Sequence, residues 1–87
     1  MRNNFDDISF YFKKSDGFEI TNSSNNFAII VNTKTFQIAE IFRTSANYYE
    51  VLTANSISCR RLCTRSYTDA LKEVKHFFAD STLHTRL

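Results

Sequence analysis

The 87-residue sequence contains no proline and a single glycine, the two residues that most often mark turns. Its turns must therefore be built from Asn, Asp, Ser and Thr, whose side chains bond to the nearby backbone. One glycine cannot form a glycine-rich phosphate-binding loop, so that class of nucleotide site is excluded. Without proline, the edges of any sheet lack one common form of protection.

Cysteine, histidine and long apolar runs are also scarce. Cys59 and Cys63 cannot form a disulfide framework, and on an extended strand they lie about 13 Å apart, too far to pair. Neither makes a recognised ligand spacing with His76 or His84, so we expect no metal and no cofactor. The longest apolar run, Phe27–Val31, is too short to cross a membrane, and the polar N-terminus lacks a secretory signal. We therefore expect a cytoplasmic, reducing location and no membrane partner.

Apolar and aromatic side chains are plentiful for so short a chain. They make up 43% and 15% of the residues, with nine Phe and four Tyr, whereas disordered chains are poor in both classes. Large rings remove much surface from water, which suits a small core. The length corresponds to one domain, so we predict a single domain over 1–87 with mobile tails at 1–7 and 82–87.

Alternating and continuous apolar segments predict an antiparallel sheet of about four to six strands. A strand at Ile8–Lys13 is expected to turn at Asp16-Gly17, a strong hairpin signal, and to return at Phe18–Thr21. After a loop at 22–26, the apolar run Phe27–Val31 predicts a strand that is central or buried on both faces. Later strands are expected at Phe36–Phe42, Tyr48–Leu52 and Ile57–Thr64.

Two of the later strands have irregular patterns. In Phe36–Phe42 the apolar residues Ile41 and Phe42 are adjacent, which a bulge near Glu40 would explain. In the last strand we expect the two cysteines on the inner face, because free cysteine is among the most buried residue types. Arg61 then falls between them on that face, so either a bulge turns it outward or this strand is an edge.

The sequence ends in one strongly amphipathic helix. Ser66 is a good N-cap, and Asp69 at the third helical position gives a weaker version of the capping box. Apolar residues then recur at helical spacing: Tyr67, Ala70, Leu71, Val74, Phe77 and Phe78. We expect the helix to end near Asp80. Packing its apolar stripe on one face of the sheet buries both surfaces, which predicts an α+β fold with one C-terminal helix.

The net charge of +2 is too small to indicate nucleic-acid or membrane binding by itself, but the charges are unevenly distributed. Residues 1–54 hold five basic and six acidic groups, whereas residues 55–87 hold six basic and three acidic groups. No acid lies between Glu50 and Asp69. Three arginines fall in that interval: Arg60, Arg61 and Arg65.

These arginines and two tyrosines of the preceding strand form the predicted partner-binding surface: Arg60, Arg61, Arg65, Tyr48 and Tyr49. Arg65 directly precedes the helix, whose N-terminus attracts anions. Exposed tyrosine beside arginine is favoured in protein interfaces and for stacking on nucleic-acid bases. The alternative is that these residues are only a solvated outer surface.

No nucleophile, base and orienting group share a recognised pattern, although Cys63 or Ser66 with His76 can be imagined as a hydrolase site. We expect no catalysis and favour a binding protein that occupies a surface of a protein or nucleoprotein partner. In size and in its lack of catalytic motifs the chain is similar to phage and mobile-element inhibitors such as anti-CRISPR proteins. Direct nucleic-acid binding by the basic and aromatic residues and a homodimeric structural protein joined at sheet edges remain alternatives.

Overall fold

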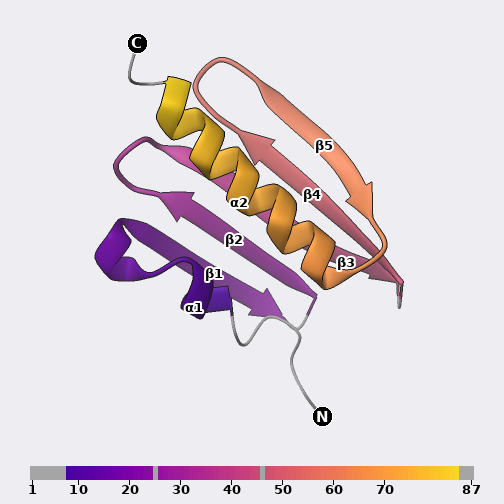
Figure 1. The fold of residues 1–87 in the computed structure, drawn as a ribbon. Coiled ribbons are helices and arrows are strands. Elements are labelled where there is room, and N and C mark those ends of the chain that lie inside the picture. Colours follow the sequence, from indigo (N-terminus) through magenta and orange to yellow (C-terminus); the bar gives the residue numbers. More distant parts are fainter. Residues whose placement is uncertain (1–7, 25, 46, 85–87) are drawn as a thin grey trace.

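A five-stranded antiparallel sheet with one long helix across its face makes up the fold (Figure 1). The computed structural model describes residues 8–24, 26–45 and 47–84. Its strands are β1 (Phe18–Ser24), β2 (Phe27–Asn32), β3 (Gln37–Ser45), β4 (Tyr48–Ala54) and β5 (Cys59–Thr64). Its helices are α1 (Ile8–Tyr11), the 3₁₀ helix η1 (Lys14–Asp16) and α2 (Tyr67–His84). The strands pair in chain order and α2 packs on them, so the predicted α+β architecture is confirmed.

The first element is a helix, whereas the alternating pattern predicts a strand at Ile8–Lys13. Ile8 and Phe12 are both buried in the core, and the Phe12 N–H donates to the Ile8 carbonyl at 3.2 Å. Residues four apart share one face of a helix, but residues two or four apart also share one face of a strand. The apolar spacing therefore fits both structures, and the prediction of a strand is wrong.

Gly17 ends η1 and does not form the predicted Asp16-Gly17 hairpin turn. Its φ of 96° lies in the left-handed region, and its N–H donates to the Lys14 carbonyl at 3.0 Å. Glycine often takes this position after the last turn of a helix because it has no Cβ. The Gly17 carbonyl also accepts the Thr33 N–H at 2.7 Å, which ties the start of β1 to the turn after β2.

The strands of the sheet differ in detail from the predicted ones. β1 continues to Ser24, into the segment 22–26 whose composition predicts a loop. β3 pairs without interruption on both sides of Glu40, so the predicted bulge there is absent. The register of the β3–β4 pair shifts instead between Arg43 and Ser45, close to the turn. Ile41 and Phe42 are adjacent because the two faces of β3 are both partly apolar.

The start of α2 is predicted correctly and its end is not. The Ser66 hydroxyl accepts the Asp69 N–H at 3.1 Å, as expected of an N-cap. The helix then continues to His84, beyond its predicted end. Of the predicted tails, 1–7 and 85–87 lie outside the described residues, whereas 82–84 belong to the last turn of α2.

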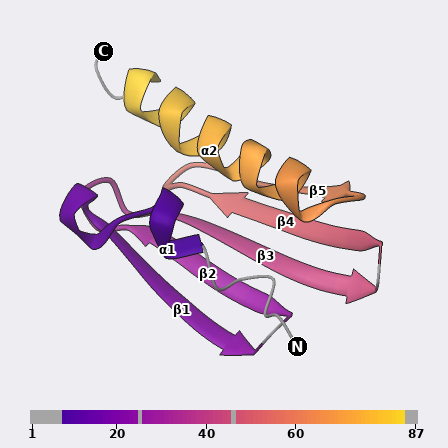
Figure 2. The ribbon, with the colours of Figure 1, turned by 60° about the horizontal axis from the view of Figure 1, so that its bottom comes forward.

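The core lies between α2 and the inner face of the sheet, which is the face that α2 covers (Figure 2). Its fully buried side chains include Ala28, Ile30, Ala39, Ile41, Val51, Ala70 and Val74. Strand pairing aligns these residues, with Ile30 opposite Ala39 and with Val51 opposite Ile41. Each strand of this central group contributes alternate residues to the core, as expected for a sheet packed on one face.

Three phenylalanines close the β1 side of the core. Phe12, Phe18 and Phe78 form a triangle of edge-to-face rings whose centroids are 5.1 to 5.8 Å apart. The Lys75 Nζ also lies 4.1 Å from the ring centroid of Tyr11, which joins α2 to α1 on the surface. α1 therefore packs on the same side of the sheet as α2.

A pair of matched substitutions in β3 distinguishes the two faces of the sheet. Ile41 is 0% exposed on the inner face, so Ile41→Ala should lower the free energy of unfolding by about 3 kcal/mol. Ile38→Ala removes the same atoms from the other face, where Ile38 is 38% exposed, and should cost about 1 kcal/mol or less. Urea unfolding followed by circular dichroism measures both, and equal losses would contradict this assignment of faces.

Candidate protein-binding surface

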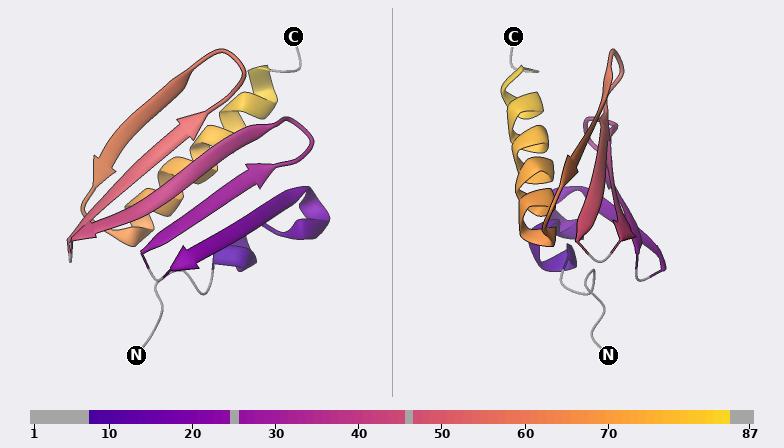
Figure 3. Two further views of the ribbon diagram at one scale, coloured as in Figure 1. Left: turned by 180° about the vertical axis from the view of Figure 1, so that it is seen from behind. Right: turned by 90° about the vertical axis from the view of Figure 1, so that its right-hand side faces the viewer.

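The second face of the sheet has no covering element among residues 8–24, 26–45 and 47–84. Figure 3, right, shows α1 and α2 on the same side of the sheet. We call the uncovered side the open face. The strand register and the alternation of side chains place these residues on it: Glu19, Thr21, Phe27, Ile29, Val31, Ile38, Glu40, Phe42, Glu50, Leu52, Ala54, Cys59, Arg61 and Cys63.

The centre of the open face is apolar. Phe27, Ile29 and Val31 of β2 are only half-buried, although the run Phe27–Val31 is typical of a strand covered on both sides. The rings of Phe27 and Phe42 lie across the β2–β3 pair with centroids 4.5 Å apart. A sheet face that meets water usually carries polar side chains, so this surface has the composition of an interface.

Glu40 lies in the middle of this apolar centre. Its cross-strand neighbours are Ile29 on β2 and Leu52 on β4. The side chain is half-buried, and no residue in the part of the chain that the structure describes forms an ion pair or hydrogen bond with its carboxylate. The centre of the open face therefore combines an apolar surface with a carboxylate that has no counter-ion among the described residues.

The three predicted arginines are all exposed and all belong to the β5 edge. Strand alternation directs Arg61 to the open face and Arg60 to the α2 side, whereas Arg65 follows the end of β5. The Arg61 Nε lies 3.7 Å from Glu50 Oε2, so part of its charge is compensated. β5 is an edge strand, as one of the two explanations for Arg61 requires, but the arginines do not share one face.

The two predicted tyrosines occupy different environments. Tyr48 is 48% exposed, whereas Tyr49 is 5% exposed and lies in the core, with its ring centroid 6.0 Å from that of Tyr67. Consecutive residues of a strand point to opposite faces, so they could not both contribute to one surface. The expectation that Tyr49 is exposed is wrong, and Tyr48 alone remains available to a partner.

The cysteines of β5 are exposed, in contrast to their predicted inner position. Cys59 and Cys63 lie on the open face, and Leu62 takes the inner position opposite Val51. A preference of residue type for burial is weak at an edge strand, where only one inner side chain reaches the core. The prediction therefore reversed the two faces of β5.

Exposure of both thiols is directly measurable. Ellman's reagent should react with Cys59 and Cys63 in the native protein as fast as with small thiols, because neither side chain is covered. The Cys59→Ser and Cys63→Ser single variants should each lose one equivalent of reactive thiol. A reaction that requires denaturant would instead support the buried position.

Phe36 is an exposed aromatic residue in a left-handed backbone conformation. It lies in the turn between β2 and β3, has a φ of 63° and is 78% exposed. Asn32 holds this turn: its Oδ1 accepts the Lys34 N–H at 2.9 Å and its carbonyl accepts the Phe36 N–H at 2.7 Å. Glycine and asparagine are favoured in this conformation, and a bulky residue is strained. The turn directly adjoins the Val31–Ile38 pair of the open face.

Relief of this strain is testable. Phe36→Gly should raise the free energy of unfolding by about 0.5 to 1 kcal/mol, which is the left-handed penalty less the additional chain entropy that glycine loses. Lys34→Gly, in the same turn at negative φ, should lower it instead. Urea unfolding compares the two, and a destabilised Phe36→Gly variant would show that the ring makes stabilising contacts.

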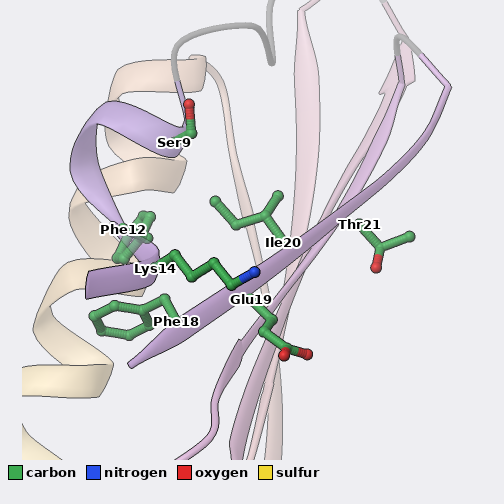
Figure 4. A pocket seen from close by; sticks show the side chains of 7 residues that line it. All are labelled: Ser9, Phe12, Lys14, Phe18, Glu19, Ile20 and Thr21. Atoms are coloured by element: carbon green, nitrogen blue, oxygen red, sulfur yellow. The ribbon is translucent and has the colours of Figure 1, made fainter. Parts of the chain in front are cut away.

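A shallow pocket of about 330 Å³ follows the free edge of β1 (Figure 4). Its lining residues are Ser9, Phe12, Lys14, Phe18, Glu19, Ile20 and Thr21. Four consecutive β1 residues contribute, so the pocket lies along this strand edge, where it also contacts the core residue Phe12. It contains no histidine or cysteine.

Comparisons with protein-family models, curated proteins and solved structures find no match for this chain. Its function is therefore inferred from its own residues. Among the described residues, no group of three or more His, Cys, Asp or Glu side chains could hold a metal ion. Within the same residues, no helix is long and apolar enough to cross a membrane.

Proposed function

We propose that this chain is a non-catalytic binding protein whose open face covers a surface of a protein or nucleoprotein partner. The observation that supports the proposal is the uncovered apolar centre of that face, formed by β2, β3 and β4. Apolar surface of this kind is favourable to bury, and a sheet of paired strands holds it in place before binding. Inhibition by covering a contact site, as in small phage or mobile-element inhibitors such as anti-CRISPR proteins, is one form of this function, with a cytoplasmic partner.

Direct nucleic-acid binding is the second candidate. It is favoured by Arg60 and Arg65, which are exposed and lie in the acid-free interval between Glu50 and Asp69. It would act through the β5 edge and would weaken steeply with added salt. The acids of the open face, Glu19, Glu40 and Glu50, would repel phosphate, so the two candidate functions use different surfaces.

Pairing of two β5 strands into a homodimer is less favourable. An antiparallel pair centred on Arg61 would place this residue opposite its own copy, and like charges directly opposite destabilise a sheet. Charged edge strands are a common protection against such pairing. The basic residues of β5 therefore argue against self-association at this edge.

The proposal is tested by pull-down from a lysate of the cells in which the protein acts, with matched variants of the two surfaces. Ile29→Thr/Ile38→Thr reduces the apolar area of the open face and keeps β-branched residues in the strands. Capture of a protein should fall at least tenfold with this variant, and it should persist with Arg60→Ala/Arg65→Ala and after nuclease treatment. Circular dichroism verifies that both double variants are folded.

The opposite pattern would overturn the proposal. Capture that survives the isoleucine substitutions but is lost after nuclease treatment or with the arginine variant would indicate nucleic-acid binding. A dimer that dissociates on dilution in sizing chromatography, with no captured protein, would indicate the structural role.

A further inference from the structure

We infer that the partner surface covered by the open face is apolar and carries a lysine or arginine at its centre, which forms an ion pair with Glu40. The inference rests on the proposed function and adds the chemistry of the partner. It predicts a protein segment that combines apolar side chains with a positive charge, and it excludes nucleic acid as the occupant of this face.

Glu40 lies between two apolar side chains of the open face. Ile29 and Leu52 flank it in the same row across the sheet, so a partner that covers those two side chains also covers the carboxylate. An ionised carboxylate that loses its water is strongly unfavourable unless it gains a counter-ion or hydrogen-bond donors. No described residue of this chain supplies either. The partner must therefore bring the compensating group, and a lysine or arginine supplies both a positive charge and hydrogen-bond donors.

The remaining charges on the open face also favour a positively charged partner. Glu19 and Glu50 lie near its margins, and Arg61 is the one basic residue among those that define the face. Arg61 already lies 3.7 Å from Glu50 and stands two strands away from Glu40. The face is thus acidic overall, although the whole chain has a net charge of +2. Complementary charge steers a cationic partner to this face and disfavours other partners.

A second copy of this chain fits the face poorly. Two identical sheets packed face to face are related by a two-fold axis in the plane between them. An axis that runs along β3, the middle strand, covers β2 and β4 fully but brings one Glu40 against the other. An axis over β4 would bring Arg61 of the copy toward Glu40, but it would leave part of β2, the most apolar strand, uncovered.

Selection from a phage library of random 16-residue peptides tests the inference without knowledge of the natural partner. The immobilised wild-type protein should enrich peptides that contain apolar residues together with Lys or Arg. Glu40→Lys should enrich acidic peptides in their place. Glu19→Lys changes the net charge of the protein equally at the margin of the same face, and it should keep the preference for basic peptides.

The second measurement is the affinity of one selected peptide for the wild-type protein and for two variants. A basic peptide selected on the wild-type protein should bind Glu40→Gln at least tenfold more weakly, because its cation loses the partner carboxylate. The same peptide should bind Glu19→Gln within about twofold of the wild type, as expected for a rim charge. Glu40→Gln keeps the shape of the side chain, so a folded variant is expected, and circular dichroism verifies it.

The outcomes separate this inference from the proposed function. If no peptide is enriched, or if enriched peptides bind Ile29→Thr/Ile38→Thr as well as the wild type, the open face is not a protein-binding surface and both proposals fail. If binding depends on the isoleucines but shows no preference for basic peptides, or keeps that preference on Glu40→Lys, the role of Glu40 alone is wrong.

Discussion

One helix can cover only one face of a five-stranded sheet. This constraint determines which other residues complete the core and which apolar side chains stay exposed. Five strands span about 20 Å between the outer two, whereas a helix with its side chains is about 10 Å wide. α2 therefore leaves part even of the inner face to other groups, and Ile8, Phe12 and the phenylalanine triangle fill the β1 side. Among the residues that the structure describes, no comparable set of side chains covers the second face. The one long helix among these residues, α2, lies on the first face, so within the described part of the chain the apolar side chains of β2 and β3 on the second face have no covering element.

The elements with a strong period are predictable from the sequence, and those that depend on distant contacts are not. α2 follows from its repeating apolar residues and from Ser66, and β2 follows from the run Phe27–Val31. The segment at Ile8 has a spacing that fits both helix and strand, and only the space beside the phenylalanine triangle selects the helix. In β5 the inner face is identified by a single residue, Leu62, so burial preferences of the neighbouring cysteines were enough to reverse it.

The apolar residues of the open face appear in the sequence as an irregular pattern in β3, which has a simpler explanation than a bulge. Ile41 and Phe42 are adjacent because one belongs to the core and the other to the open face. The run Phe27–Val31 is continuous for the same reason, because its residues belong alternately to the core and to the open face. The charge pattern and the tyrosine pair indicated β4 and β5 instead, but Tyr49 of β4 is in the core and the arginines of the β5 edge face different directions. Two apolar faces on neighbouring strands, with one helix to cover them, is the pattern that would have located the open face.

An exposed apolar face can cause aggregation, because it also favours contact between copies of the same chain. The single carboxylate at its centre reduces this risk, since a symmetric contact whose two-fold axis runs along β3 brings two Glu40 side chains together without water. The same group penalises a partner that is merely apolar, because Glu40 would be buried without a counter-ion. In the proposed complex, affinity would come from the six large apolar side chains around Glu40, and discrimination would come from its charge. With a hydrophobic residue at position 40, the open face would bind a wider range of apolar surfaces, including the open face of a second copy. It would also discriminate less between them.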